Sequence, residues 1–572
     1  MKKFWKISLT VLLVLLLLIA AAIFYVFSTF KPNDLKPRLT DFFQQKYQRQ
    51  LLIPGELQLS LWPLLHIESG KISLLEKNGS DVLASMESAK ISLVWRPLIE
   101  GRLEVDGVTL DAPSVHIKRF ADGTTNIDDF LTGGGGGPGQ FDIKGLKINR
   151  ASWVFDDQAT QWNMTNANLQ VGRLSNGVPT DFKFDGDLRL NQDQLNAHID
   201  LNSPLLFDLA KQNFSLGKLA LAIKGTSKAA NTTTLNDIAL NATGAMTFDA
   251  AKKLTHLGEW TLQSQLINGD EKWQATVAFS EAEQQGKNWR AKNISSQAEQ
   301  QTAAYHLNTT LNMPELNSID ARMSGKDVKL TTQWTAKPDA KKGSAKKNQN
   351  TINALLTLGA LDDVNDASGQ TSYDLHTLHL EAKGVVDAAP VKLHADGDIQ
   401  IINNNQIVTK GPLRVQFNYQ PVGLALEGSL KTEAKIMLER EQYELSPLLF
   451  DLTITPTDFK RPMTLIGNGA MNTDLKRKII SAKLQAKFNQ AKLEGKIGVA
   501  GFTPPAYTFD VLLSEFNTAW LENKTGAAKT AGDLPDFGWL KKLNANGVLR
   551  IGELISADKR ATNVRTDVKS DK

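Results

Sequence analysis

The chain has 572 residues, and its 65 Lys and Arg residues against 61 Asp and Glu give a formal net charge of +4. A charge so close to neutral over this length argues against a dedicated nucleic-acid-binding protein, and 41% hydrophobic residues exclude a chain that is disordered throughout. The absence of cysteine excludes disulfides, zinc–thiolate sites, thiol catalysis and cysteine-ligated iron–sulfur clusters.

The sequence begins with a basic segment and a long apolar run. Three lysines precede residues 7–27, in which one serine, one threonine and one tyrosine are the only polar side chains. A helix of this length rises about 31 Å, which matches the hydrocarbon thickness of a bilayer. We therefore expect residues 1–30 to form a transmembrane anchor. Its membrane-embedded side chains would include Ile7, Leu12, Leu16, Ile19, Ile23 and Phe27.

A cleaved signal peptide is the alternative for this segment. Residues 20–22 are three alanines and offer a small-residue cleavage site, but the apolar run continues past them through residues 23–27. A short basic segment before a large body favours a single-pass inner-membrane protein, with a cytoplasmic N-terminus and a periplasmic body. Lys31, Lys36 and Arg38 follow the run, so the local charge bias is nearly balanced.

Residues 34–49 are predicted to form one short amphipathic helix. Apolar residues recur at helical spacing from Leu35 to Tyr47, and Asp34 stands at the position of an N-cap. A helix that follows a membrane span either lies in the membrane interface or docks on the body of the protein. The sequence leaves both arrangements open.

From residue 51 the hydrophobic period changes to two. Leu57, Leu59 and Leu61 alternate with polar residues, and similar alternation recurs as far as residues 484–488, interrupted by turn pairs such as Asn78-Gly79. Helical periods beyond residue 50 are short. The fold is therefore predicted to be mainly β, with a long and largely antiparallel sheet that has one apolar and one polar face.

Two breaks divide this β body. Residues 133–139 form a glycine-rich linker that lacks the Gly-Lys-Ser/Thr of a phosphate-binding loop. Residues 337–350 form a basic loop, which is either a solvated tip or a contact with anionic headgroups. The breaks predict an N-terminal module and two β-sheet bodies, at residues 31–132, 140–336 and 351–572.

A short internal repeat occurs near the start of the body. Residues 105–117 align with residues 143–155, because each has an apolar residue, a glycine two positions later and alternation into the next strand. Residues 67–74 form a shorter third copy. Similar strand–turn–strand units laid side by side would build a long, quasi-repetitive sheet.

The sequence offers no clear catalytic or metal site. Eight histidines are scattered along it, and His376 and His379 form an H-x-x-H pair. On a regular strand residues three apart point to opposite faces, so we expect no shared metal ion there. Asp128 and Asp129 fall in a predicted first helical turn, where acids suit the helix dipole. We therefore expect no catalytic residues, no metal ligands and no cofactor.

Short motifs follow one another in the first 175 residues, from Pro32-Asn33-Asp34 through Trp62-Pro63 and Gly70 to Gly123 and Asn126. This order resembles the amino-terminal region of the AsmA family of Gram-negative envelope proteins. Residues 539–543 and 547–552 are similar to the start of that family's carboxy-terminal region, which would normally continue beyond Lys572. We expect a structural role for the residues that carry the resemblance. They are Pro32, Asn33, Asp34, Trp62, Pro63, Gly70, Pro97, Gly107, Pro113, Gly123 and Asn126.

The resemblance implies an inner-membrane anchor and a periplasmic body related to the chorein-type modules of bridge-like lipid transfer proteins. In those modules a long curved sheet forms an elongated trough with an apolar interior. Alternation alone is equally compatible with a closed sandwich of two sheets. If the trough is present, the residues expected to line it are Leu57, Leu59, Leu61, Ile72, Leu74, Ile91, Leu93, Leu103, Val105, Val115 and Ile117.

The leading functional hypothesis is a non-enzymatic protein of outer-membrane biogenesis that carries phospholipid between envelope membranes along an apolar groove. The alternative is an envelope scaffold that affects the assembly of outer-membrane proteins or lipopolysaccharide. A hydrolase or transferase would need a nucleophile or metal that the sequence does not supply. The expected partners are phospholipid, the inner membrane, and outer-membrane assembly factors or another envelope protein, without nucleic acid.

Overall fold

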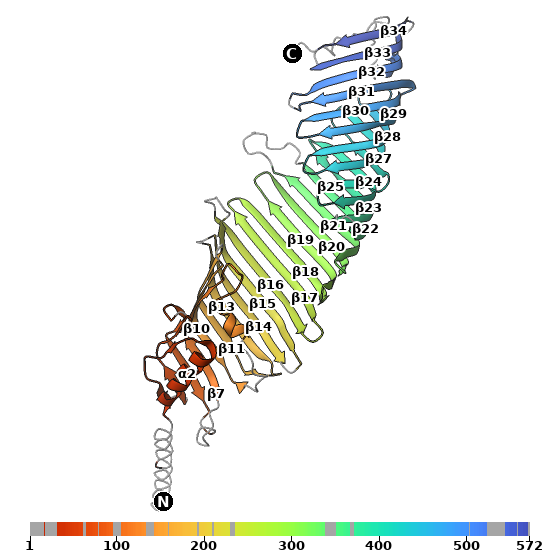
Figure 1. Ribbon diagram of the computed structural model, residues 1–572. Helices are drawn as coiled ribbons and strands as arrows, with labels where there is room; N and C mark the ends of the chain where they lie inside the picture. The colour runs from red at the N-terminus through yellow and green to blue at the C-terminus, as the bar shows by residue number, and fades with distance from the viewer. Residues whose placement is uncertain are drawn as a thin grey trace, which may run out of the picture. The chain divides into compact units, whose positions relative to one another are not determined.

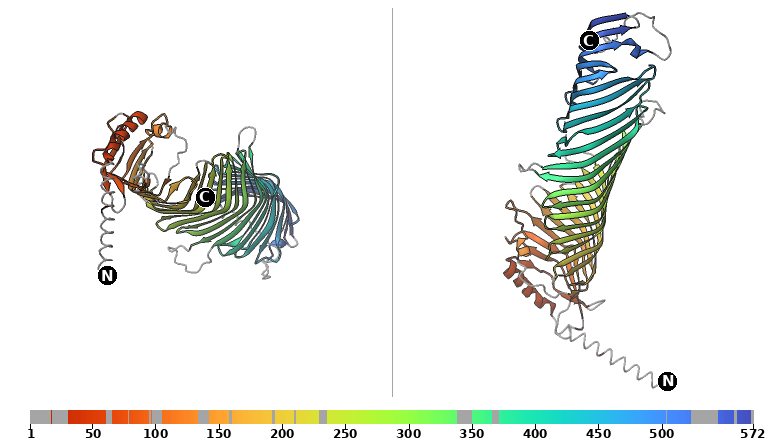
Figure 2. Two further views of the ribbon diagram at one scale, coloured as in Figure 1. Left: turned by 90° about the horizontal axis from the view of Figure 1, so that it is seen from below. Right: turned by 90° about the vertical axis from the view of Figure 1, so that its right-hand side faces the viewer.

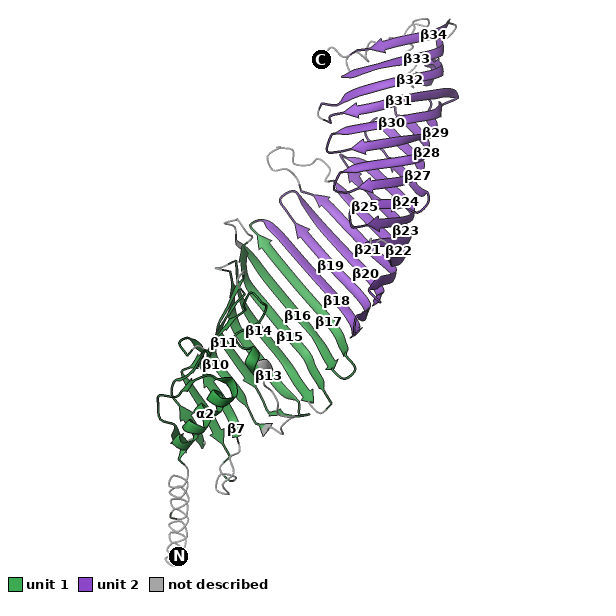
Figure 3. Ribbon diagram, in the orientation of Figure 1, with its two compact units in different colours: residues 1–269 green, residues 270–572 purple. Residues whose placement is uncertain are grey.

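The computed structural model divides into two compact units, residues 1–269 and residues 270–572 (Figure 3). Each unit is mainly β, as the alternation predicts. The predicted glycine-rich linker and most of the basic loop lie outside the residues that the structure describes. The described residues are 17, 31–60, 65–77, 79–94, 96, 105–132, 142–157, 160–191, 194–208, 211–228, 235–337, 350–365, 371–502, 504–522, 544–556 and 559–569.

Unit 1 begins with a small module of helices and short strands. Helix α2 (Leu35–Tyr47) confirms the predicted amphipathic helix. The strands that follow are short, and the parallel pairing of β7 and β8 with β10 joins them to the rest of the unit. The elements are η1 (Pro32–Asp34), α2, β1 (Leu51–Leu52), β2 (Gln58–Ser60), β3 (His66–Ser69), β4 (Ile72–Leu75), β5 (Val82–Met86), β6 (Ser88–Leu93), β7 (Val105–Asp111), β8 (Ser114–Lys118) and α4 (Asp128–Thr132).

The predicted N-cap position of α2 is confirmed, but the side chain there does not cap the helix. Asp34 holds the N-cap position, but its backbone is already helical and its side chain accepts no hydrogen bond from the helix. The side chain of the preceding residue contacts a different segment, because Asn33 Oδ1 accepts a hydrogen bond from the backbone N–H of Leu57 at 3.0 Å. The contact ties the start of the helix to the first strands.

None of the helices in the described part of the chain has the length and apolar character needed to cross a bilayer. The anchor predicted at residues 1–30, with Ile7, Leu12, Leu16, Ile19, Ile23 and Phe27, lies outside the described residues.

Longer strands complete unit 1. They follow one another as antiparallel neighbours from β10 to β17, apart from a two-stranded pairing of β9 with β12 (Figure 1). Their bounds are β9 (Asp142–Ile143), β10 (Leu146–Asp156), β11 (Gln161–Val171), β12 (Leu174–Ser175), β13 (Thr180–Leu190), β14 (Leu195–Asp208), β15 (Asn213–Lys228), β16 (Leu235–Asp249) and β17 (Leu254–Asn268).

Unit 2 is a second ladder, whose strands are antiparallel except for the parallel pair β32–β33. Figure 2 shows these strands, coloured green to blue, as a curved single layer. Their bounds are β18 (Glu271–Gln285), β19 (Asn288–Gln301), β20 (Tyr305–Ile319), β21 (Arg322–Ala336), β22 (Thr351–Asn365), β23 (Thr371–Val386), β24 (Ala389–Ile402), β25 (Gln406–Thr409), β26 (Leu413–Tyr419), β27 (Leu424–Met437), β28 (Gln442–Pro456), β29 (Met463–Asp474), β30 (Ile479–Phe488), β31 (Ala491–Ala500), β32 (Ala506–Asn517), η3 (Thr518–Leu521), β33 (Ala545–Ser556) and β34 (Lys559–Val568).

The internal repeat seen in the sequence becomes a structural pairing. Strands β7 and β8 run parallel to β10, and Val108 lies opposite Leu146 while Val115 lies opposite Trp153. These are the residues that the repeat aligns with one another. Ala112 and Arg150, which also correspond, both have positive φ values, of 46° and 54°. The two copies therefore share a backbone conformation and lie side by side in register.

Bulges interrupt the long strands. Asn166 in β11, Lys218 in β15 and Glu259 in β17 have positive φ values at points where the pairing register shifts. A bulge inserts one extra residue into a strand, which bends it and increases its twist. The extra residue also places side chains three positions apart on the same face.

One such bulge corrects the prediction for the two neighbouring histidines. Thr377 has φ of 54°, and the register shifts between Leu375 and Leu378. His376 and His379 therefore lie on the same face of β23, and the expectation of opposite faces is wrong. The two imidazoles nevertheless have different partners, because His376 Nε2 lies 3.7 Å from a carboxylate oxygen of Asp362.

A buried arginine joins the parts of the N-terminal module. Arg49 follows α2, is only 2% exposed and forms ion pairs with Asp129 of α4 at 2.9 Å and with Glu76 at 2.7 Å. It also donates to the backbone carbonyl of Asn126, and its guanidinium lies over the ring of Phe130. Removing one partner of a buried pair leaves the other charge without compensation.

The side chain of Asn126 extends this network to a neighbouring strand. Its amide donates to Glu76 at 2.6 Å and to the backbone carbonyl of His116, and its oxygen accepts from the backbone N–H of Lys118. Each polar atom of the amide thus has a partner, which explains why an asparagine suits this buried position.

We expect Arg49→Ala to destabilise the N-terminal module by about 3–5 kcal/mol, because Asp129 and Glu76 would keep their partly buried charges without the guanidinium. The matched control is Arg150→Ala, whose ion pairs are exposed to solvent and should contribute little to stability. Hydrogen exchange of the α2 and β4 amides measures the difference. Equal protection in the two variants would contradict a structural role for Arg49.

The same cluster predicts a dependence on pH. Burial opposes ionisation of Asp129, but hydrogen bonds and charge from Arg49, together with the charge of Lys77, outweigh it and lower the pKa of this carboxyl group. Its stabilising effect is complete above the unfolded pKa, about 3.9, and is lost as the pH falls through the lower folded pKa. The wild-type advantage over Asp129→Asn in denaturant unfolding should therefore shrink on acidification below that range. An advantage that is constant with pH would refute this account.

Candidate functional site: the apolar face of the sheet

Apolar side chains form a continuous row across unit 1. Each residue of the row lies directly opposite the next one on the neighbouring strand, so the row crosses the strands nearly at right angles. Its only polar member is Ser69, at the start. The row consists of Ser69, Ala89, Leu110, Ile148, Leu169, Phe184, Leu201, Leu221, Ala242 and Leu262.

The residues one position before or after these form a polar row on the opposite face. Alternation along a strand places neighbours on opposite faces, so the sheet of unit 1 is amphipathic across its whole width. Ala220 is the only apolar member. The polar row consists of Glu68, Lys90, Thr109, Lys147, Gln170, Lys183, Asn202, Ala220, Thr243 and Thr261.

Unit 2 has an apolar row of its own, which crosses the strands from β18 to β34 apart from the short strand β25. Ser296 is its one polar side chain, and Gly467 leaves one gap. The row consists of Val277, Ser296, Leu311, Leu330, Leu356, Leu380, Ala395, Val415, Leu430, Phe450, Gly467, Ala486, Leu493, Leu513, Ile551 and Val564.

The opposite face of unit 2 is mainly polar. Its central row contains Lys329, His379, Asp396, Arg414 and Lys431 in direct cross-strand succession, with Thr357 between the first two. Both units therefore repeat one pattern, an apolar row on one face and a polar row on the other.

Beyond the N-terminal module, no second layer covers these apolar rows among the described residues. From β11 onward, the substantial contacts of each long strand are with its hydrogen-bonded neighbours, apart from a contact between η3 and β33. Figures 1 and 2 show the long strands of each unit as a single layer. The described strands thus do not form the closed sandwich that the alternation left open. Leu262 and Phe214 remain 40% and 42% exposed, which is unusual for large apolar side chains that share one face.

The N-terminal module covers the first part of the apolar face. Leu35 of α2 packs against a core formed by Leu57, Ile67 and Leu93, which are 8%, 6% and 5% exposed. At the far side of the helix, the ring of Tyr47 stacks on Phe130 with centroids 4.5 Å apart. The helix therefore docks on the body, although Leu39 and Phe42 remain exposed.

The residues predicted to line a groove fall into three groups. Leu59, Ile91 and Val105 pack around the core beneath α2, where Leu57 and Leu93 are buried. A second set lies on strands β4 and β8. Cross-strand pairing connects this set to Trp153 of β10 and Met164 of β11. Contact of any of these residues with lipid stays a prediction. The second set is Ile72, Leu74, Val115 and Ile117, whereas Leu61 and Leu103 lie outside the described residues.

The residues that carry the family resemblance are distributed over turns and strand ends. Asn126 is buried in the Arg49 network, and Gly123 occupies a turn with φ of 85° that side chains other than glycine rarely adopt. A Cβ at Gly107 would lie 3.3 Å from the carbonyl oxygen of Gly145 in the neighbouring copy of the repeat. Pro32 opens η1, Asn33 and Asp34 follow it, Gly70 and Pro113 lie between strands, and Trp62, Pro63 and Pro97 lie outside the described residues.

Comparison with known proteins agrees with this architecture. The profile of the AsmA family matches residues 1–413. Protein AsmA of Escherichia coli (strain K12) is 27% identical over 209 residues, a match that covers 34% of this chain and 32% of that protein. The match thus spans about a third of the length of this relative, and no solved structure is similar. Because the family profile covers more than half of its residues, the chain belongs to the AsmA family.

Proposed function

We propose that this protein carries phospholipid between the membranes of the cell envelope, with the acyl chains held against the apolar face of the sheet. The observation that supports the proposal is the nearly continuous row of apolar residues across the sheet of each unit. Neighbouring members of a row lie on adjacent strands, which are about 4.8 Å apart. An acyl chain can therefore pass from strand to strand without meeting a polar side chain over most of each row.

The energetics of lipid in water favour such a path. Exposing the acyl chains of a phospholipid, with about thirty CH₂ groups, fully to water costs roughly 20–25 kcal/mol of free energy. Free diffusion through an aqueous compartment is therefore negligible, and a carrier must keep the chains covered. A sheet with one apolar face supplies this cover through non-directional contacts, so the proposed role needs no nucleophile, metal or cofactor for a chemical step.

The proposal places the anchor of residues 1–30 in the inner membrane and the body in the periplasm. An anchor at one end would keep the sheet beside a supply of lipid, and α2 would lie between the membrane and the sheet. The family membership supports a role in the biogenesis of the outer membrane. Direction and energy source would be provided by other components.

Site-specific photocrosslinking in intact cells tests contact with lipid. A photoreactive amino acid at Leu221, on the apolar face of β15, should yield phospholipid adducts. The matched control is Ala220, its sequence neighbour on the opposite, polar face. Crosslinks only to proteins at Leu221 would favour the scaffold hypothesis, and equal lipid adducts at both positions would refute a specific path on the apolar face.

A charge placed in the apolar row tests whether this face binds lipid. An unpaired carboxylate among acyl chains costs several kcal/mol, and even about 3 kcal/mol would slow passage by roughly 100-fold. We therefore expect Leu356→Glu to reduce the phospholipid that co-purifies with the full-length chain, measured by mass spectrometry. Thr357→Glu, on the polar face of the same strand, is the control. Circular dichroism of both variants checks folding, and unchanged lipid content in folded Leu356→Glu would contradict the proposal.

A further inference from the structure

A compact group of histidines and carboxylates lies on the polar face of unit 2. His379 and Glu381 are two residues apart on β23, and His394 and Asp396 are two residues apart on β24. His379 lies directly opposite Asp396, and Glu381 lies directly opposite His394. The four side chains therefore occupy the corners of a square on one face of two neighbouring strands.

The turn between the strands fixes this register. Asp387 and Ala388 both have positive φ values, of 49° and 68°, which is typical of the two-residue turns that match the twist of antiparallel strands. The backbone N–H of Asp387 also donates to Asn350 Oδ1 at 2.7 Å. A one-residue slip would move the four side chains to the other face, so the turn determines whether they meet.

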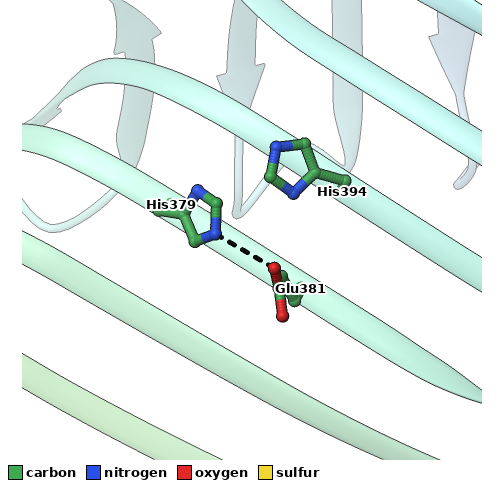
Figure 4. Close-up of side chains that lie close together, drawn as sticks. All are labelled: His379, Glu381 and His394. Atoms are coloured by element: carbon green, nitrogen blue, oxygen red, sulfur yellow. Dashed lines mark hydrogen bonds and ion pairs between the residues drawn. The ribbon is translucent and has the colours of Figure 1, made fainter.

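Asp396 orients both imidazole rings. Its Oδ1 lies 2.6 Å from His379 Nδ1, and its Oδ2 lies 2.7 Å from His394 Nε2. Asp396 thus contacts one nitrogen of each ring, and the second nitrogen of each ring is the one that could coordinate a metal ion. His379 Nε2 lies 3.3 Å from Glu381 Oε1, as Figure 4 shows, and one ligand atom from each of His379, Glu381 and His394 lies within 4.8 Å of the others.

We propose that His379, Glu381 and His394 bind a zinc ion, with Asp396 holding the two imidazoles in position. Two imidazoles and one carboxylate are a common set of zinc ligands, and a carboxylate hydrogen-bonded to the other ring nitrogen is the usual support of a ligating histidine. Calcium and magnesium prefer oxygen ligands alone, so the imidazoles favour a transition metal.

The charges around the group suit a divalent cation. Glu381 and Asp396 supply two negative charges, so the complex with zinc is neutral. Because the complex is neutral, its cationic neighbours do not oppose it: Lys383 and Lys392 lie two residues along the strands, and Arg414 lies opposite Asp396.

The fourth coordination position would face open space. Glu381 and His394 line a hollow of about 1100 Å³ on this face, together with amide side chains such as Asn353 and Gln416. The histidine and glutamate side chains are themselves partly exposed. A bound ion would therefore join β23 to β24 and still accept water or another small ligand.

Calorimetry on the full-length chain tests the proposal. The protein is purified in detergent without a histidine tag, stripped with EDTA and titrated with zinc chloride. We expect one zinc per chain, and we expect His379→Ala and His394→Ala each to weaken binding by at least about tenfold. Asp396→Asn should weaken it while the cobalt-substituted protein keeps its tetrahedral visible spectrum, as expected for a residue that positions the ligands.

His306→Ala is the matched control. His306 is also partly exposed and lies 2.9 Å from a carboxylate oxygen of Glu299, but it is outside the group of four. Its substitution should leave zinc binding unchanged. The proposal is overturned if the wild-type chain binds no zinc, or if a folded His379→Ala/His394→Ala variant retains wild-type affinity. Glu381→Gln, which keeps the side-chain shape, provides a second variant whose unchanged affinity would also contradict the assignment.

Discussion

The structure depends on the fixed alternation of side chains along a hydrogen-bonded strand. Because each hairpin returns the chain in register, a residue such as Leu201 meets Leu221, and the next strand adds Ala242 to the same row. The polar residues between them are forced to the other face. An amphipathic surface much wider than a single strand therefore follows from local pairing repeated many times, without a conventional two-layer core.

The bulges show how a long strand bends without losing this separation of faces. At Thr377 the extra residue resets the alternation, so that Leu375 and Leu378 both contribute to the apolar cluster of unit 2 although they are three residues apart. The same reset places His376 on the face of His379. One irregularity thus serves both faces: it preserves the apolar row and sets the position of a polar side chain.

Much of the fold could be predicted from local patterns. The helix at Leu35–Tyr47, the β character of the body and the repeat that pairs Val108 with Leu146 all rest on short-range periodicity. The Arg49 network could not be predicted, because its partners come from segments 27 and 80 residues away. The H-x-x-H spacing does not predict the histidine group, because the partner of His379 is His394 on the next strand and not His376. Counting outward from the turn at 387–388 would have placed H-x-E opposite H-x-D.

A ladder of hairpins also has a simple rule for changing its length. Each pair of antiparallel strands returns the chain to the edge of the sheet at which the pair began. The next strand then runs in the same direction and has the same face apolar, so whole hairpins can be gained or lost while the remaining rows stay aligned. Loss of a single strand would reverse the direction of everything that follows. Strands β32 and β33 are an exception, because they are parallel neighbours and residues 518–544 separate them in the sequence.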